Sequence, residues 1–214
     1  MTTALLSTTY FGPLQWYQKL YRYDHVIVDQ QETFQKQTYR NRCLIATTQG
    51  VQALTVPVVH GSDNHIQSIG ISDHGNWRHL HWQALQSAYG DSPFFEYYEG
   101  DLRPFFVERN WERLIDYNDA ICKKMCELLD IQSAVELSNL KPPLGRRTLA
   151  TGGTQETSNL KDFRTAINPK HPLPDADFEP RPYYQVYKQK LGFLPNLSIL
   201  DLLFNMGPES IFYL

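Results

Sequence analysis

The sequence has few cysteines and no excess of positive charge, and each shortage excludes a class of protein. Its 214 residues include only Cys43, Cys122 and Cys126, an odd and sparse set unlike the disulfide framework of a secreted protein. The formal net charge of −3 argues against a nucleic-acid partner bound through bulk electrostatics. We therefore expect no nucleic acid among its partners.

The sequence also lacks membrane and export segments. No apolar run approaches the roughly 20 residues that a membrane-spanning helix needs. Residues 1–7 lack the basic start and the long apolar stretch of a signal peptide. The sequence therefore predicts a cytoplasmic protein without a membrane span, and it leaves the oligomeric state unknown.

The composition is otherwise that of a globular protein. Apolar residues make up 42% and charged residues 20% of the chain, which is enough material for a buried core. We expect a single domain over residues 1–214. The 13 Tyr, 11 Phe and 4 Trp favour an aromatic core, or alternatively a pocket or interface that uses tyrosine hydroxyls.

Apolar spacing at the start of the chain predicts a βαβ unit. Residues 5–10 suit a short buried strand, and residues 26–29 suit a second one. Between them a helix is expected from Gly12-Pro13 to about Tyr23, because proline fits the first helical turn. This compact order favours parallel pairing of the two strands.

The middle of the chain predicts further strands and two helices. A hairpin is expected over residues 43–59 and another strand over 66–71, followed by a helix from Trp77. The longest helix is expected over about 105–129, and a short strand over 134–137. The fold class is thus α/β, with an N-terminal βαβ unit that continues into a hairpin-containing mixed sheet packed by helices.

The pattern breaks down in the second half. Residues 138–162 contain few apolar residues, and prolines recur from 169 to 182. We expect 138–182 to be a long irregular Pro/Thr-rich insertion or lid. Ordered structure returns with the apolar segment 197–204, which ends at Gly207-Pro208.

The first candidate site lies where the two N-terminal strands end. Parallel neighbours end at the same sheet edge, where open α/β sheets bind ligands. The helix start at Pro13, just after Tyr10, offers free N–H groups to an anion. Asp29 could accept from a ribose, an amine or a metal-bound water, or it could cap the next turn. The chain has no complete nucleotide-binding motif, so the cofactor is unknown.

The second candidate is the basic run Arg40-Asn41-Arg42. Two arginines can hold a phosphate or carboxylate bidentately, and in an extended segment their side chains face the same side. A solvated basic edge is the alternative.

Histidines cluster between residues 60 and 81, which raises the question of a metal. His79 and His81 fall two residues apart on a predicted helix and so face different sides, which argues against a zinc site. His81 shares the inward face with Trp77. It is a candidate base, although an inward histidine is more commonly a hydrogen-bonded core residue.

Polar residues interrupt two apolar stretches. Asn118 lies in the stripe of the predicted long helix, where a buried amide needs partners or a ligand. Asp201 follows Ser198 by three residues, which is the spacing of a capping box, so structure alone could explain it. Cys122 and Cys126 suit small core residues.

Several blocks in this order resemble the WbqC-like protein family. The blocks are Tyr10-Phe11-Gly12-Pro13 with Tyr17, Tyr39-Arg40-Asn41-Arg42, Leu54-Thr55-Val56-Pro57, Trp77 with His81, Tyr89 and Pro93-Phe94-Phe95, and residues 193–210. The family's acidic pair followed by Gln is here Asp29-Gln30-Gln31-Glu32, so only Asp29 carries over.

The resemblance implies a bacterial protein, with some relatives encoded in O-antigen gene clusters and a suggested aminoacyl (glycine) transferase role. The positions that match the family and become ligand-binding candidates are Tyr10, Pro13, Tyr17, Arg40, Asn41, Arg42, His81, Tyr89, Ser198, Asp201 and Asn205.

Two functions compete. In the first, an acyl- or aminoacyl-transferase acts on an amino sugar or nucleotide-linked sugar in surface polysaccharide biosynthesis. Arg40 and Arg42 would hold the anionic nucleotide-sugar or acyl donor, and His81 or Asp29 would deprotonate the attacking amine. In the second, the chain is a non-catalytic binding or scaffold protein of the cell-envelope pathway. Convergence of these residues on one pocket favours the enzyme, and scatter favours the scaffold.

Overall fold

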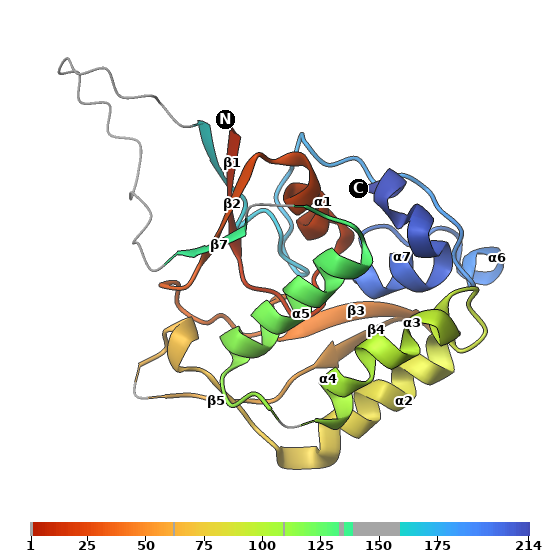
Figure 1. Cartoon of the computed structure of the whole chain (residues 1–214), viewed down its shortest axis with the longest axis horizontal. Helices are drawn as coiled ribbons and strands as arrows, with labels where there is room; N and C mark the ends of the chain where they lie inside the picture. Colours follow the sequence, from red (N-terminus) through yellow and green to blue (C-terminus); the bar gives the residue numbers. More distant parts are fainter. Residues whose placement is uncertain (1, 62, 109, 133–134, 139–158) are drawn as a thin grey trace.

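The predicted βαβ unit forms the start of a parallel sheet (Figure 1). In the computed structural model, which describes residues 2–61, 63–108, 110–132, 135–138 and 159–214, β1 (Thr2–Ser7) and β2 (His25–Asp29) pair in parallel. They are joined by α1 (Leu14–Arg22), which begins after Pro13. Ala4, Leu5 and Leu6 of β1 are buried, as are Val26 and Val28 of β2, so this pairing forms one wall of the core.

Two further strands complete this sheet within the described residues. The order is β7-β2-β1-β8, with β7 (Val135–Ser138) beside β2 and β8 (Asn159–Asp162) beside β1, and all the pairings are parallel. The expected strand at 134–137 is therefore β7. The expectation that 138–182 is wholly irregular is wrong at β8. That strand has one apolar residue, Leu160, which is exposed, so it forms through main-chain pairing with β1 and leaves no apolar signal.

The part of this segment that follows β8 is irregular as expected, and an ion pair holds it against α1. Lys19 of α1 is completely buried, and its Nζ lies 2.7 Å from Asp175 Oδ2. Burial lowers the pKa of Lys19, and the Asp175 carboxylate opposes this shift. Residues 139–158 of the expected insertion or lid lie outside the described residues.

The predicted hairpin is present but stands apart from the parallel sheet. It consists of β3 (Arg42–Thr47) and β4 (Gly50–Thr55), which pair antiparallel. The expected strand over 66–71 is a short 3-10 turn, η1 (Ile66–Ser68), followed by β6 (Gly70–Ile71), which pairs with β5 (Val58–Val59). The described strands thus form three sheets instead of one mixed sheet.

Helices pack around this hairpin, and α2 and α7 both contact β3 (Figure 1). The described helices and 3-10 turns after β6 are η2 (His74–Asn76), α2 (Trp77–Tyr89), α3 (Phe95–Leu102), α4 (Pro104–Val107), α5 (Leu114–Leu128), α6 (Lys188–Leu191), α7 (Ile199–Met206) and η3 (Gly207–Tyr213). No helix in the described part of the chain is long and apolar enough to cross a membrane.

The long helix predicted over 105–129 is two helices. α4 ends at Val107, and α5 begins at Leu114. Between them the chain forms main-chain hydrogen bonds with the residues at β6. Ile71 N donates to Glu112 O at 2.8 Å, and Leu114 N donates to Ile69 O at 2.9 Å. These long-range hydrogen bonds override the helical periodicity, which extends across the break.

The core is aromatic, which is one of the two roles expected for the many rings. Its largest fully buried side chains include Trp16, Tyr10, Tyr17, Tyr89, Tyr117 and Phe11. Phe11 stacks on Phe106 of α4, with ring centroids 5.7 Å apart and planes 7° apart. Rings from α2, α4 and α5 meet around Tyr10 and Phe11 in the segment that follows β1.

Gly12 packs directly against Thr9, so we expect the stability of the protein to be sensitive to substitution at this position. A Cβ added at Gly12 would lie 2.9 Å from Thr9 Cβ and closer still to its Oγ1. We expect Gly12→Ala to lower the free energy of unfolding by about 1–3 kcal/mol through overpacking, measured by urea denaturation.

Gly100 supplies the control, because it lies inside α3 and nothing lies within 4 Å of an added Cβ. Gly100→Ala should raise stability by up to about 1 kcal/mol. Equal responses of the two variants would show that the contact between Gly12 and Thr9 carries no strain.

Candidate functional site

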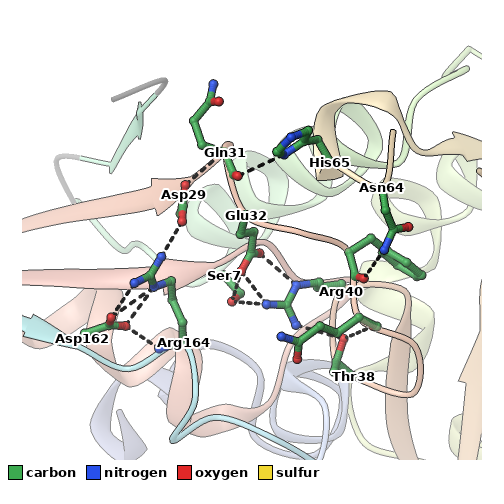
Figure 2. Close-up of polar contacts among 12 residues, drawn as sticks. Ser7, Asp29, Gln31, Glu32, Thr38, Arg40, Asn64, His65, Asp162 and Arg164 are labelled. Carbon is green, nitrogen blue, oxygen red and sulfur yellow. Dashed lines mark hydrogen bonds and ion pairs between the residues drawn. The ribbon is translucent and has the colours of Figure 1, made fainter. Parts of the chain in front are cut away.

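Charged and polar side chains gather at the carboxyl edge of the parallel sheet (Figure 2). β1 ends at Ser7, β2 at Asp29 and β8 at Asp162. Because the strands are parallel, these residues lie at one edge, and Ser7 pairs in register with Asp29. We call this group, together with Glu32, Arg40 and Arg164, the edge cluster.

Arg40 is committed to partners within the edge cluster. Its Nε donates to Glu32 Oε1 at 2.9 Å, and its Nη2 pairs with Oε2 of the same carboxylate. Nη2 also donates to Ser7 Oγ at 2.9 Å. Arg40 is only 5% exposed, so it does not form the solvated basic edge that was the alternative. Burial raises the pKa of Glu32, and the charge of Arg40 opposes the shift.

Arg164 links the two aspartates of the edge cluster. Its Nη1 lies 2.6 Å from Asp29 Oδ2, and its Nη2 lies 2.6 Å from Asp162 Oδ2. Burial acts to raise the pKa of Asp162, but hydrogen bonds and the positive charge from Arg164 outweigh burial and lower that pKa. Asp29 Oδ1 also accepts from the backbone N–H of Gln31 at 2.8 Å, so Asp29 both caps its turn and faces the cluster.

Two small cavities, each of about 10 Å³, border the end of β1. Both are lined by Thr8, Thr9 and Trp16; one adds Arg40 and Arg164, and the other adds Asn118. A cavity of this volume is just large enough for one water molecule. Thr9 Oγ1 and Asn118 Oδ1 are buried without a hydrogen-bond partner among the described residues. The edge therefore offers two unsatisfied oxygens beside its charges.

Asn118 also connects the edge to α5. Its Nδ2 donates to Arg40 O at 2.8 Å and to Thr8 Oγ1 at 3.1 Å. The amide nitrogen of Asn118 therefore has the hydrogen-bond partners that a buried amide was predicted to need.

His81 is separate from the edge cluster and forms contacts between α2 and the hairpin. Its Nδ1 is 2.9 Å from the Tyr10 hydroxyl, and its ring also hydrogen-bonds the Thr55 carbonyl. Because a carbonyl only accepts, the ring donates to Thr55, and Nδ1 accepts from Tyr10. Burial lowers the pKa of His81 to about 4. These are the contacts of a hydrogen-bonded core histidine, which was the alternative interpretation.

Asp201 and Tyr89 belong to a third group, which is buried between α2 and α7. Asp201 accepts from the hydroxyls of Tyr89 at 2.9 Å and Tyr183 at 2.6 Å, and from Gln185 Nε2 at 2.8 Å. Burial raises the pKa of Asp201, although all three donors oppose it. Asn205 donates to Asp201 O at 2.7 Å. Every described contact in this group is internal.

Ser198 caps α7, as its spacing predicted. Its Oγ accepts from Leu200 N at 3.3 Å and donates to Phe11 O at 2.8 Å. The side chain of Asp201, the other half of the expected capping box, bonds to the tyrosines instead.

The remaining predicted residues are buried or bonded within the fold. Pro13 precedes α1 and forms a bridge with Ser198, and Tyr17 is completely buried in α1. Asn41 Nδ2 donates to Val56 O at 2.8 Å, and Arg42 Nε donates to Thr55 Oγ1 at 3.1 Å.

The structure thus brings together only part of the predicted set. Asp29 and Arg40 meet in the edge cluster, whereas Arg42 and His81 have partners elsewhere. Sequence reasoning missed Ser7, Glu32, Asp162 and Arg164. Ser7 could have been found as the polar end of the first strand, but Asp162 and Arg164 depend on recognising β8. Within the described residues no group of three or more His, Cys, Asp or Glu is arranged to hold a metal ion.

Comparisons with known proteins agree with the sequence blocks described above. A model of the WbqC-like protein family matches residues 8–213. The uncharacterized protein Rv1507c of Mycobacterium tuberculosis is 27% identical over 228 residues, which cover 99% of this chain and 96% of the relative. No solved structure gives a significant match.

The low pKa of His81 predicts a pH dependence of stability. The folded-state pKa is about 4 against an ordinary 6.5, so the unfolded chain binds the proton first. The contribution of neutral His81 to the free energy of unfolding is therefore fully present above pH 6.5. It is lost as the pH drops towards 4, which lowers the unfolding free energy by about 3 kcal/mol. In His81→Gln, a plot of unfolding free energy against pH should be flatter over this range by that amount.

His79 provides the matched control, because it lies on the same helix and is exposed. His79→Gln should keep the wild-type slope. A wild-type slope in His81→Gln as well would show that the imidazole does not titrate with unfolding.

Proposed function

Because this chain belongs to the WbqC-like protein family, we propose that it is an acyl- or aminoacyl-transferase in bacterial surface polysaccharide biosynthesis, acting on an amino sugar or nucleotide-linked sugar. The observation that carries the proposal is the edge cluster. It combines buried carboxylates, two guanidinium groups and unsatisfied oxygens at the sheet edge where α/β proteins bind ligands.

The charge balance of the edge cluster suits an amine. Three carboxylates, those of Asp29, Glu32 and Asp162, face two guanidinium groups, those of Arg40 and Arg164. With every group ionised the sum is −1, which favours the protonated amine of an amino sugar over an isolated anion. We therefore assign the acceptor amine, and not the donor phosphate, to this edge.

The same groups suit the chemistry of amide formation. The bound ammonium must lose one proton before its nitrogen attacks the acyl carbon, and in this proposal Asp29 or Glu32 accepts that proton. The C–N bond forms and the bond from the acyl carbon to the leaving group breaks. The second N–H proton that the nitrogen loses passes to the leaving group, and the carboxylic acid releases the first proton to solvent. Arg164, whose side chain is 26% exposed, is the guanidinium group of the cluster that reaches solvent and would stabilise the developing oxyanion.

A binding or scaffold protein of the cell-envelope pathway is the rival function. The observation in its favour is that His81, Tyr89, Asp201 and Asn205 have internal partners and no open face among the described residues. If these family positions maintain the fold, the family blocks would be common to a scaffold as well.

Binding and transfer can be measured separately. Wild-type protein should be stabilised in a thermal-shift assay by a nucleotide-linked sugar that carries a free amine, and mass spectrometry should detect the amide when glycyl or acyl donors are added. Arg164→Gln should weaken both by about tenfold or more. Asp29→Asn should reduce transfer more than binding, because it keeps the shape but loses the base.

The control is Arg113→Gln, which removes an exposed arginine from its ion pair with Asp116 and should change neither signal. Ligand stabilisation without any amide product would support the scaffold function. Unchanged binding and transfer in Arg164→Gln and Asp29→Asn would remove the edge cluster from the site.

A further inference from the structure

A second cleft, separate from the edge cluster, lies between the start of α2 and α4. It has a volume of about 230 Å³. Its walls are the rings of Trp77, Trp82 and Phe106, with Arg78 and the exposed Val107, Asp73, Asn76 and His79 at its margins. At about 30 Å³ per water molecule, it has room for one small ring with a substituent.

Arg78 is the charged group of this cleft, and it is held in place. Its guanidinium carbon lies 4.4 Å from the centroid of the Trp77 ring, a stacking arrangement that fixes the plane of the guanidinium. The side chain is 10% exposed, and its Nη1 pairs with Asp73. Little conformational entropy remains to be lost when such a group binds an anion.

Arg78 has hydrogen-bonding capacity that the described residues do not use. Its Nε is buried and has no hydrogen-bond partner among them. Nε and Nη2 form the side-on fork that pairs with a carboxylate or phosphate. A buried donor without a hydrogen-bond partner is costly. Because Arg78 lines the cleft, an acceptor that enters the cleft and reaches Nε would offset that cost.

The contact with Asp73 does not block this use. Asp73 is 55% exposed, so its pairing with Arg78 contributes little and is screened by solvent. Nη1 is also on the other side of the guanidinium from the Nε fork. The first turn of α2 adds to the attraction for an anion, because Asn76 at its start makes no side-chain capping hydrogen bond.

We propose that this cleft binds a small organic anion, namely an aromatic or apolar ring that bears one carboxylate or phosphate. The fork of Arg78 pairs with the anionic group, and the ring lies among the Trp82, Phe106 and Val107 side chains. This site is independent of the proposed transfer at the edge cluster, because no residue lines both.

Two probes distinguish the source of the anion. Phenyl phosphate and benzoate are titrated into the full chain by calorimetry, and the NMR signal of the Arg78 Nε–H is followed. At least one probe should bind with a Kd on the order of 1 mM or below and shift that signal. Inorganic phosphate and benzyl alcohol, which each carry half of the recognised chemistry, should bind at least about tenfold more weakly.

Val107→Glu is the diagnostic variant, because it places a like charge at the mouth of the cleft on a residue that is 56% exposed. It should weaken the probe by about tenfold or more. Tyr97→Glu is the matched control: Tyr97 is 73% exposed on α3 and does not line the cleft, so binding should be retained. Arg164→Gln should also bind normally, which separates this test from that of the transferase.

Three results would overturn the proposal. The first is that neither probe binds at about 10 mM. The second is that both glutamate variants lose binding equally, or that neither does, which would place the anion outside the cleft. The third is that inorganic phosphate binds as tightly as phenyl phosphate, which would remove the aromatic walls from the site.

Discussion

The segment that follows β1, residues 8–13, is the constraint on which the rest of the structure depends. It is buried throughout, and its main chain is held from several directions. Tyr10 N donates to Tyr39 O, and Ile199 N donates to Gly12 O, both at 2.9 Å. Buried backbone groups must find partners, so this segment joins the parallel sheet to the hairpin and to α7.

Side chains of the same segment extend these connections. Tyr10 reaches His81 on α2, and Thr8 receives the Asn118 amide of α5. Phe11 takes a φ of 40°, a conformation that costs a non-glycine residue about 1–2 kcal/mol. Its stacking on Phe106 and the hydrogen bond from Ser198 to its carbonyl offset that cost. The family blocks therefore meet around residues 8–13.

This arrangement explains why several polar family positions have structural partners, whereas charged groups gather at the sheet edge. Tyr10, His81, Ser198 and Asn118 are bonded to the segment or to each other, because each buried polar group needs a partner. The edge cluster begins at Ser7, the residue directly before this segment. There the parallel strands end, and charged side chains from the following loops form ion pairs. The well-bonded segment 8–13 therefore lies beside the edge cluster and supports the positions of its side chains.

The sequence by itself determined the local elements. Apolar spacing located the hairpin, α2 and α7, and it predicted the βαβ unit, although β1 lies at Thr2–Ser7 and not at residues 5–10. These elements depend on residues close in sequence, such as Ser198 at the start of α7 and Gly207, with a φ of 55°, after its end. Tertiary structure decided the break before α5, the strand β8 and the ion pairs of Arg40 and Arg164. These depend on partners far away in the chain, up to 135 residues for Asp29 and Arg164, and local periodicity carries no information about such contacts.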